Sequence, residues 1–518
     1  MVDKQAHPLL RDRAVGLSAE LVRQLDEAVD AVDRRQPEQA EALLAELLAR
    51  EPACAEARRL LGVVQQLRGE HALAVANLRQ AVAQNPDDAL AQMNLGIALQ
   101  SVGEPEAALA ALRRTCGLAP DFAPGWFNYG QMLLALGRPV GAITALHRVL
   151  DHDPDHPAAR LVLAEAQAGL GAAAQAAANY REVLQRRPAS AEAWTGLCNL
   201  AGERFGADDV ARLRQVLQTA LPTPAVRTAL GFVLARALED QAEFHEAFRV
   251  LRKANAQVRR QVQWNASAEH ARAEAILAAF ASPLDGAREA SADGQVVFVV
   301  GLPCSGAALV AHSLAAHPQA GGDDRPDLQQ VIQAESLRRG PVGARRAGTQ
   351  TPEDWARLGR DYLARSDSRR GGKPWLVDAC LPNWLLLGAA MTMLPQARVV
   401  NVRRDALETC FDCYSQLFAS GNEFSYALDD LAGYWHDYDR LLRHWQALYP
   451  GRVLELTGES LLAEPEDQLR RVLAFCGLDD DPACAARLRA ERGARADVAR
   501  GALYGSELDR LRKLLDAA

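Results

Sequence analysis

The stretch VVFVVGLPCSGAALVAHSLAAHP, residues 296–318, decides how the second half of this chain folds. An apolar run typical of a buried strand ends at a glycine-containing turn, and an apolar pattern with helical spacing follows it. Gly301 and Gly306 have the spacing of a phosphate-binding loop, in which backbone N–H groups and a helix N-terminus hold an anion. The next residues are Ala307 and Ala308, where a nucleoside triphosphatase has lysine and serine or threonine. The stretch therefore predicts strand, loop and helix, and argues against a triphosphate hydrolase or an ordinary kinase.

Around this stretch, short apolar segments alternate with longer helical patterns. The segments that read as buried strands are QVVFVV (295–300), PWLVDA (374–379), ARVVNV (397–402) and RVLELT (452–457). Such alternation predicts an α/β domain with a parallel sheet. Because ligands of these sheets bind at the carboxyl ends of the strands, the loop after residue 300 is the candidate site.

The first half of the chain repeats with a period of 34 residues. Prolines stand at Pro52, Pro86, Pro120, Pro154, Pro188 and Pro222. Glycines and alanines keep the same step, and several independent registers in phase exclude chance. The repeat is clearest in ALAQMNLGIALQSVGEPEAALAALRRTCGLAPD (89–121), which resembles the tetratricopeptide repeat. This resemblance implies helical hairpins that stack into a solenoid, with a concave peptide-binding surface or, alternatively, the role of a spacer or dimerisation arm.

The repeat phase and the polar stretch SPLDGAREASADG (282–294) predict the domain boundaries. The expected repeats run over 21–54, 55–88, 89–122, 123–156, 157–190 and 191–224, and a looser helical pair follows them. We therefore expect an N-terminal segment 1–20, a repeat domain 21–258, a connecting helix and linker 259–293, and an α/β domain 294–518.

Composition excludes several classes of protein. The chain of 518 residues has a formal charge of −8, which gives no general argument for nucleic acid or an anionic membrane. The start of the sequence lacks an apolar targeting core, and the longest apolar run, near 385–394, is too short for a membrane span. Nine cysteines, an odd number, favour free thiols and a cytoplasmic location. Cys410 and Cys413 have CxxC spacing, but without a second ligand pair we interpret them as helix-packing residues.

Three segments of the second half resemble sulfotransferases. Residues 297–319 resemble the first nucleotide motif, 397–435 the second motif with its strand, paired arginines and helix, and 452–478 the segment after it. The resemblance covers nearly all of 294–480. With the upstream repeats, it matches bacterial tetratricopeptide-repeat sulfotransferases, which are similar to tyrosylprotein sulfotransferases. The resemblance implies 3′-phosphoadenosine 5′-phosphosulfate as donor, a hydroxyl as acceptor and no metal.

The resemblance also implies which residues form the site. Those expected to bind the cofactor are Gly301, Pro303, Cys304, Ser305, Gly306, Ala307, Ala308, Arg403, Arg404 and Asp412. The acidic base of the tyrosylprotein enzymes lies in the loop after His-Pro, here HPQAGGDDRPDL. In that loop Asp324 is the best match for the base and Asp323 the second choice.

This sequence departs from the family at several of these positions. Cys304 replaces an arginine, Ala307 and Ala308 replace threonines, Ala379 replaces a lysine, and Asp412 replaces a serine that donates to the 3′-phosphate. Because one preorganised donor is worth about 10²–10³ in rate, these changes together remove much of the expected catalysis. Nearby arginines that could restore positive charge are Arg338, Arg339, Arg345, Arg346, Arg369 and Arg370.

Two hypotheses follow for the function. The chain is either a sulfotransferase acting on a hydroxyl, such as a peptide tyrosine presented by the repeats, or a degraded sulfotransferase fold that serves as a protein-binding scaffold or regulator. In both, the expected partner is a protein or peptide on the repeat surface.

Overall fold

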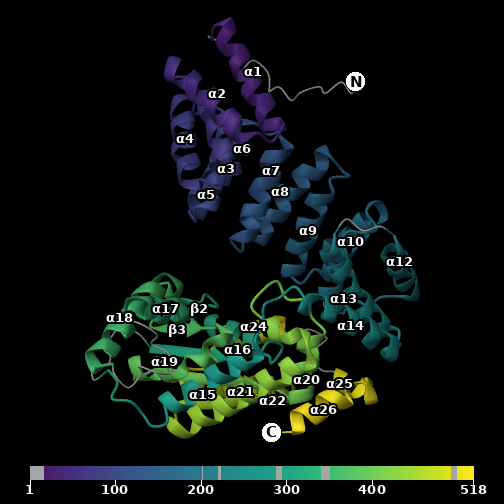
Figure 1. Cartoon of the computed structure of the whole chain (residues 1–518), viewed down its shortest axis with the longest axis vertical. Helices are drawn as coiled ribbons and strands as arrows, with labels where there is room; N and C mark the ends of the chain where they lie inside the picture. Colours follow the sequence, from purple (N-terminus) through teal and green to yellow (C-terminus); the bar gives the residue numbers. More distant parts are fainter. Residues whose placement is uncertain are drawn as a thin grey trace. The chain divides into compact units, whose positions relative to one another are not determined.

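The computed structural model describes residues 17–200, 202–219, 223–287, 295–339, 350–491 and 499–517. The chain divides into two compact units, Met1–Leu200 and Ala201–Ala518 (Figure 1). The first unit consists of paired helices, and the second contains a β-sheet covered by helices.

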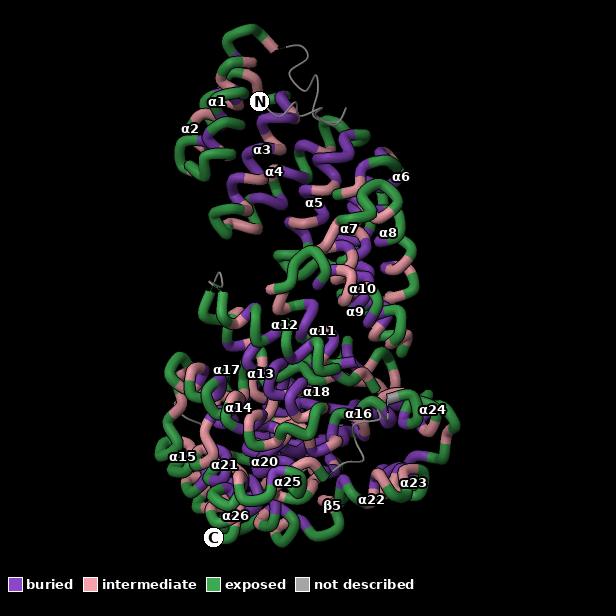
Figure 2. Tube along the Cα trace, turned by 90° about the vertical axis from the view of Figure 1, so that its right-hand side faces the viewer, coloured by how far each residue is buried: buried purple, intermediate pink, exposed green. Residues whose placement is uncertain are grey.

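Ten described helices of the first unit follow one another as five pairs, from α1 with α2 to α9 with α10, and α11 comes after them. They are α1 (Ala19–Asp33), α2 (Pro37–Arg50), α3 (Ala55–Leu67), α4 (His71–Gln84), α5 (Ala89–Ser101), α6 (Pro105–Leu118), α7 (Ala123–Ala135), α8 (Pro139–His152), α9 (Pro157–Gly169), α10 (Ala173–Arg186) and α11 (Ala191–Asn199). Figure 2 shows buried segments within these helices and exposed turns between them. These pairs confirm the helical hairpins predicted from the 34-residue period.

Two kinds of glycine explain how each hairpin closes. A Cβ on Gly62 would lie 2.5 Å from Leu78 Cγ, and a Cβ on Gly96 would lie 2.6 Å from Leu112 Cγ. Glycine therefore lets the two helices of a pair approach closely. The turn glycine Gly69 has φ 77°, a left-handed conformation that ends the first helix of its pair.

A hydrogen bond also recurs every 34 residues in this unit. Trp126 Nε1 donates to the carbonyl of Pro120 at 2.7 Å, and Trp194 Nε1 donates to Pro188 at 2.8 Å. The same bond to a proline six residues earlier is made by Arg58, Gln92 and Arg160. The repeat thus preserves a side-chain N–H donor at this position rather than one residue type, and the donor satisfies a carbonyl at the turn between hairpins.

The second unit begins with helices and continues as an α/β domain. Its helices are α12 (Ala207–Gln218), α13 (Pro224–Asp240), α14 (Phe244–Arg259), α15 (Ala266–Ala279), α16 (Ala307–Ala315), α17 (Asp327–Arg339), α18 (Pro352–Arg370), η3 (Leu381–Leu385), α19 (Leu387–Met393), α20 (Ala406–Tyr414), η4 (Glu423–Tyr426), α21 (Leu428–Leu448), α22 (Gly458–Ala463), α23 (Pro465–Cys476), α24 (Pro482–Glu491), α25 (Arg500–Leu503), η5 (Gly505–Leu508) and α26 (Asp509–Asp516). Its strands are β1 (Gln295–Val300), β2 (Ala320–Asp323), β3 (Trp375–Asp378), β4 (Arg398–Arg403) and β5 (Val453–Thr457).

The strands form one parallel sheet in the order β2-β3-β1-β4-β5. The four predicted strands are present, but β2 lies in a stretch that the sequence suggested to be a loop. Its two central residues are glycines, which are rare in strands. Glycine is required at both positions because the backbone of neighbouring segments approaches closely. A Cβ on Gly322 would lie 1.8 Å from the carbonyl oxygen of Val377, and a Cβ on Gly321 would lie 2.8 Å from that of Arg370.

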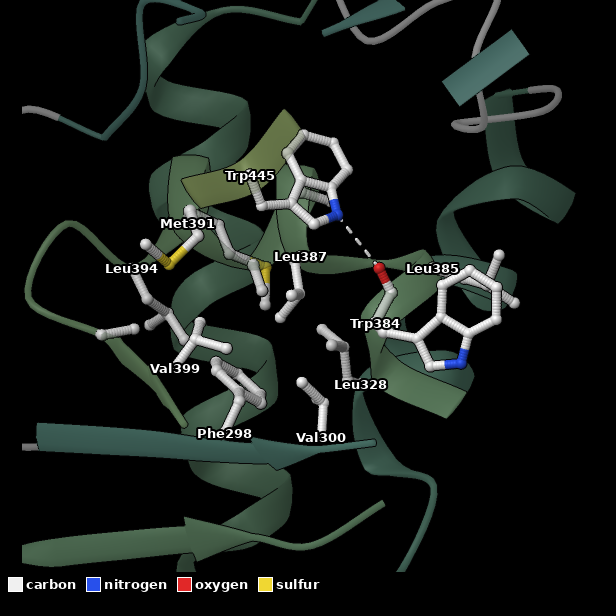
Figure 3. Packing of buried hydrophobic residues seen from close by; sticks show 14 of the residues in the cluster. Phe298, Val300, Leu328, Trp384, Leu385, Leu387, Met391, Leu394, Val399 and Trp445 are labelled. Carbon is white, nitrogen blue, oxygen red and sulfur yellow. Dashed lines mark hydrogen bonds between the residues drawn. The ribbon is translucent and has the colours of Figure 1, made fainter. Parts of the chain in front are cut away.

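Helices cover both faces of this sheet. Phe298, Val300 and Val399 pack on one face with residues of α15, α18, α19 and α21 (Figure 3). In the same core, Trp445 Nε1 donates to the carbonyl of Trp384 at 3.1 Å. Val297, Val400 and other residues on the opposite face pack against α16 and α23. Because β1 is buried on both faces, its sequence is continuously apolar.

The helical pair α13 and α14 packs within the second unit. Asn255 Nδ2, on α14, donates to the carbonyl of Tyr414 at 2.9 Å, and the ring of Phe248 contacts those of Tyr414 and Tyr504. This pair was expected as a looser seventh repeat. The compact units divide between Leu200 and Ala201, while the domain boundary expected near 282–294 stays a prediction.

Candidate anion-binding site

The candidate site lies at the carboxyl edge of the sheet, next to its central strand. From β1 the chain goes first to β2 and β3 on one side and later to β4 on the other. Loops after the central strand therefore diverge at this point, which is where open parallel sheets bind ligands. The loop between β1 and α16 occupies this position.

The backbone of the loop is held by close contacts at its first residue. A Cβ on Gly301 would lie 2.6 Å from both Ser305 Oγ and the carbonyl oxygen of Val402. The Ser305 side chain is buried, and its Oγ accepts a hydrogen bond from the Ala307 amide at 3.4 Å. Ser305 thus stabilises the conformation of the loop through a hydrogen bond to the start of α16. Gly306, with φ 93°, begins α16 in a left-handed conformation.

Three amides of this loop are available as donors. Among the described residues, the backbone N–H groups of Cys304, Gly306 and Ala308 have no hydrogen-bond partner. Unpaired amides in a glycine-containing turn before a helix can hold an anion. The side chains of these residues add no cation, because Cys304 and Ala308 are uncharged and the intervening Ala307 is buried.

At the end of β4, Arg404 is already paired within the protein. Its Nη1 lies 2.5 Å from Asp412 Oδ2, and the other oxygen of Asp412 lies 2.7 Å from Nη1 of Arg500, on α25. Arg500 in turn donates twice to Glu239, on α13, at 2.8 and 2.6 Å. Arg404 and Asp412 are only 13% and 14% exposed. The expected 3′-phosphate residues therefore belong to a half-buried chain of alternating charges, which continues from Glu239 to Arg236 at 2.8 Å.

The pKa values agree with this pairing. Burial opposes ionisation of Glu239, but hydrogen bonding to Arg500 and its charge outweigh burial and lower the pKa of Glu239. Burial also opposes the charged form of Arg500, yet hydrogen bonding to Glu239 leaves the pKa of Arg500 above its ordinary value. Both groups are therefore charged at neutral pH.

Arg403 points to the other face of the sheet. Its Nη2 lies 2.6 Å from Asp439 Oδ1 on α21, and its Nη1 lies 3.5 Å from Glu455 Oε2. Side chains alternate along β4, so Val402 packs on the α16 side, whereas Asn401 and Arg403 contact Tyr438 and Asp439 of α21. A role for Arg403 in cofactor binding stays a prediction.

The two candidate bases differ in their surroundings. Asp323 ends β2, and its carboxylate pairs with Arg369 at 2.5 Å and with Arg325 at 2.8 Å. Asp324 is exposed, and its carboxylate has no hydrogen bond or ion pair among the described residues. Burial raises the pKa of Cys380, which follows β3, to about 12, and the charges of Asp378 and Asp324 add to this rise. The Asp324 carboxylate is therefore free to act near the end of β3, and its role as a base stays a prediction.

Arg369 sits in a cluster of buried charge beside the site. Its side chain is fully buried and contacts Asp323, Asp327 and, at 3.7 Å, Asp378. Asp378 accepts hydrogen bonds from Tyr362 Oη at 2.7 Å and from the Cys380 amide at 3.1 Å. Burial raises the pKa of Asp378 to about 6, although Tyr362 and Arg369 act in the opposite direction. Arg369 thus neutralises carboxylates of the fold.

Two of the other arginines considered as substitutes pair with carboxylates of their own helices. Arg338 pairs with Glu335 at 3.4 Å, and Arg370 pairs with Asp367 at 2.7 Å. Arg345, Arg346 and the side chain of Arg339 lie outside the described residues.

Sequence reasoning missed Arg500 and Glu239, which lie 261 residues apart in the chain. Neither stands in a recognisable motif. The one available signal was Asp412, because a half-buried carboxylate in place of a serine requires a second cation nearby.

A parallel five-stranded sheet with a glycine-containing anion loop after its central strand defines an α/β protein of the phosphate-loop type. Residues 296–482 match the sulfotransferase family. Tetratricopeptide repeats match at 25–89, 68–121, 93–146 and 133–178. The chain is thus a tetratricopeptide-repeat protein with a sulfotransferase-family domain, which confirms both resemblances. The closer similarity to tyrosylprotein sulfotransferases stays a prediction.

An uncharacterized protein of Aquifex aeolicus (strain VF5) is 28% identical over 291 residues, which cover 51% of this chain and 37% of that protein. This chain therefore spans little more than a third of that relative's length.

Several solved structures are similar to part of this chain. MamA is 22% identical with a TM-score of 0.30, over 33% of this chain and 94% of MamA. YrrB, described as having an unusual peptide-binding site, is 19% identical with a TM-score of 0.31, over 34% of this chain and 90% of YrrB. A repeat protein from Parabacteroides merdae ATCC 43184 is 19% identical with a TM-score of 0.36, over 46% of this chain and 93% of that protein.

Two further findings concern the described part of the chain. It contains no cluster of three or more histidine, cysteine or acidic side chains that could hold a metal ion. It also contains no helix that is both long and apolar enough to cross a membrane.

Proposed function

We propose that this protein is a degraded sulfotransferase fold that works as a protein-binding scaffold and does not transfer sulfuryl groups efficiently. The observation that carries the proposal is the charge chain Arg404–Asp412–Arg500–Glu239. It occupies the end of β4, where the resemblance to sulfotransferases expects the 3′-phosphate of the donor. The residues at this position do not fit that phosphate.

Binding a phosphate there would require breaking ion pairs that are already made. Asp412 would present a like charge to the phosphate, and freeing Arg404 would leave Asp412 with only Arg500. Removing one partner from a buried ion pair costs about 3–5 kcal/mol. These pairs are half-buried, so we expect a smaller cost that still exceeds the gain from one new contact.

The loop after β1 fits an anion better but lacks the side chains that catalysis needs. Its unpaired amides remain, whereas Cys304 and Ala308 offer no positive charge or hydroxyl donor. Ala379 follows β3 where the family has a lysine, and its side chain is buried. Weak anion binding without rate acceleration is the expected consequence.

The repeats supply the binding function in this proposal. Stacked helical hairpins form an extended surface suited to a peptide or to a folded partner. We propose a protein or peptide as the ligand of the first unit.

Calorimetry with 3′-phosphoadenosine 5′-phosphate and transfer of radiolabelled sulfate to a tyrosine-rich peptide library test this proposal together. We expect a dissociation constant near the millimolar range and no transfer above background. Low-micromolar binding with measurable transfer would overturn the scaffold proposal.

A second candidate function is an active sulfotransferase that uses 3′-phosphoadenosine 5′-phosphosulfate and a hydroxyl acceptor, including a peptide tyrosine. The observation that favours it is that unpaired loop amides and the exposed carboxylate of Asp324 belong to the same edge of the sheet. The transfer assay distinguishes the two candidates directly.

A further inference from the structure

Cys304 has an unusual position in the loop after β1. Its φ is 65°, a left-handed conformation that residues other than glycine rarely adopt. The side chain is partly exposed, and its sulfur lies 3.5 Å from Oε1 of Gln416, just beyond α20. The backbone therefore turns this thiol toward α20, although it remains within reach of a small solute.

A second thiol lies on the facing side of α20. Cys413 is buried, and its Sγ donates to the carbonyl of Pro303 at 3.3 Å. That carbonyl belongs to the peptide bond directly before Cys304. The Cys304 thiol is also near enough to contribute to the raised pKa of Cys413. Two cysteines that are 109 positions apart in the sequence thus meet where the loop touches the helix.

We propose that Cys304 and Cys413 form a site of oxidative modification, at which a peroxide converts the two thiols into an intrachain disulfide. This inference goes beyond the proposed function and does not depend on whether the protein binds a nucleotide. The proposed pair differs from the CxxC pair of Cys410 and Cys413, because Cys413 pairs with the distant Cys304 and Cys410 takes no part.

The reaction balances with hydrogen peroxide as the oxidant. The Cys304 sulfur attacks one peroxide oxygen, the O–O bond breaks, and the products are a sulfenic acid and water. The Cys413 sulfur then attacks the Cys304 sulfur, the S–O bond breaks, and a second water leaves with the proton of Cys413. The two thiols are oxidised and the peroxide is reduced to two water molecules.

The surroundings assign the order of attack. The nearby Cys304 thiol and burial raise the pKa of Cys413 well above its ordinary value. Cys413 is therefore a buried protonated thiol, whereas Cys304 is the partly exposed one that meets peroxide first. The disulfide would tie the loop with its unpaired amides to the helix that carries Asp412.

The test treats the reduced full-length chain with hydrogen peroxide, alkylates the remaining thiols and analyses a non-reducing digest by mass spectrometry. We expect a crosslink between the peptides that contain Cys304 and Cys413, with the loss of two of the nine alkylatable thiols. Dithiothreitol should restore both. Thermal unfolding of the second unit should shift upward in the linked form and return after reduction.

Matched variants separate this disulfide from general oxidation. Cys410→Ala removes a neighbouring buried thiol of α20 and should keep the crosslink. Cys413→Ala should leave Cys304 as a sulfenic acid that dimedone traps, and Cys304→Ser, at the partly exposed position, should abolish both the crosslink and the trapping. Equal dimedone trapping in the unaltered chain and in Cys413→Ala, or oxidation of Cys304 to sulfinic acid without a crosslink, would overturn the proposal.

Discussion

The loop after β1 and the end of β4 are the two places where a sulfotransferase would hold phosphate groups, and they differ in what their polar groups do. The loop amides of Cys304, Gly306 and Ala308 are unpaired among the described residues. At the end of β4, the guanidinium of Arg404 is bound by Asp412. Backbone N–H donors are set by the path of the chain and persist when side chains change. A side-chain cation, in contrast, is no longer available to an anion once a carboxylate pairs with it.

The cluster around Arg369, near β2 and β3, also holds a cation that is paired within the protein. There the cation is fully buried and compensates carboxylates of the fold. If the paired charges at this edge of the sheet stabilise the fold, removing one of them should lower the free energy of unfolding strongly. Changes in the loop after β1 should lower it less.

The largest effect is expected for Arg369→Met. The change leaves the buried Asp378 without its cation and Asp327 with only Arg365, at 3.3 Å, and the loss of a buried partner costs about 3–5 kcal/mol. Hydrogen exchange of peptides that cover β3, measured in the full chain, should report this loss as faster exchange.

Arg370→Met is the matched control for this experiment. Arg370 neighbours Arg369 on α18, but its partner Asp367 is 63% exposed, so the loss should stay within about 1 kcal/mol. Equal exchange rates in the two variants would show that the buried cluster contributes no special stability.

The next largest effect concerns the end of β4. Asp412→Ser should release Arg404 for an anion, while Arg500 keeps its two hydrogen bonds to Glu239. Combined with Cys304→Arg, the change restores two charge-assisted contacts worth about 1.5–3 kcal/mol each. We expect binding of 3′-phosphoadenosine 5′-phosphate to tighten by about 100-fold in calorimetry, since 1.4 kcal/mol is tenfold.

Cys304→Arg alone serves as the control and should tighten binding less than the double change. Adding Ala379→Lys should increase sulfuryl transfer more than affinity. An unaltered chain that already binds the nucleotide at low micromolar concentration would remove the contrast between the two regions.

A smaller effect is expected for Gly301→Ala in the loop. The added Cβ would lie 2.6 Å from the carbonyl oxygen of Val402, so the loop must shift at a cost of about 1–3 kcal/mol. Hydrogen exchange over β1 and α16 should increase, because these elements flank the loop.

Gly433→Ala is the corresponding control on α21. Its added Cβ meets no atom within 4 Å, and alanine favours a helix over glycine by about 0.8–1 kcal/mol. The control should therefore be neutral or stabilising. Equal losses for both glycines would mean that the close packing at Gly301 does not constrain the loop.

The sequence predicted more of the fold than of the site, for physical reasons. Periodicity revealed the helical hairpins and four strands, because apolar spacing follows directly from burial. It missed β2, whose glycines are required by contact with Val377 and hide the usual strand pattern. It located the loop but not the partner of Asp412, since Arg500 and Glu239 come from distant segments without a motif. The buried role of Arg369 was equally hidden, because exposure is decided by packing.

The smallest effect on stability is expected for Asp324→Asn, and it sharpens the choice between the two functions. Asp324 is exposed and has no hydrogen bond or ion pair among the described residues, so the free energy of unfolding of the protein should change by no more than about 0.5 kcal/mol. Asp323→Asn is the matched change, and it should cost more because Asp323 pairs with the buried Arg369 at 2.5 Å. If the chain transfers radiolabelled sulfate at all, Asp324→Asn should abolish that transfer, because a general base acts in the transition state. Transfer that survives Asp324→Asn but not Asp323→Asn would reassign the base to the paired carboxylate, and would mean that Arg369 releases it during the reaction.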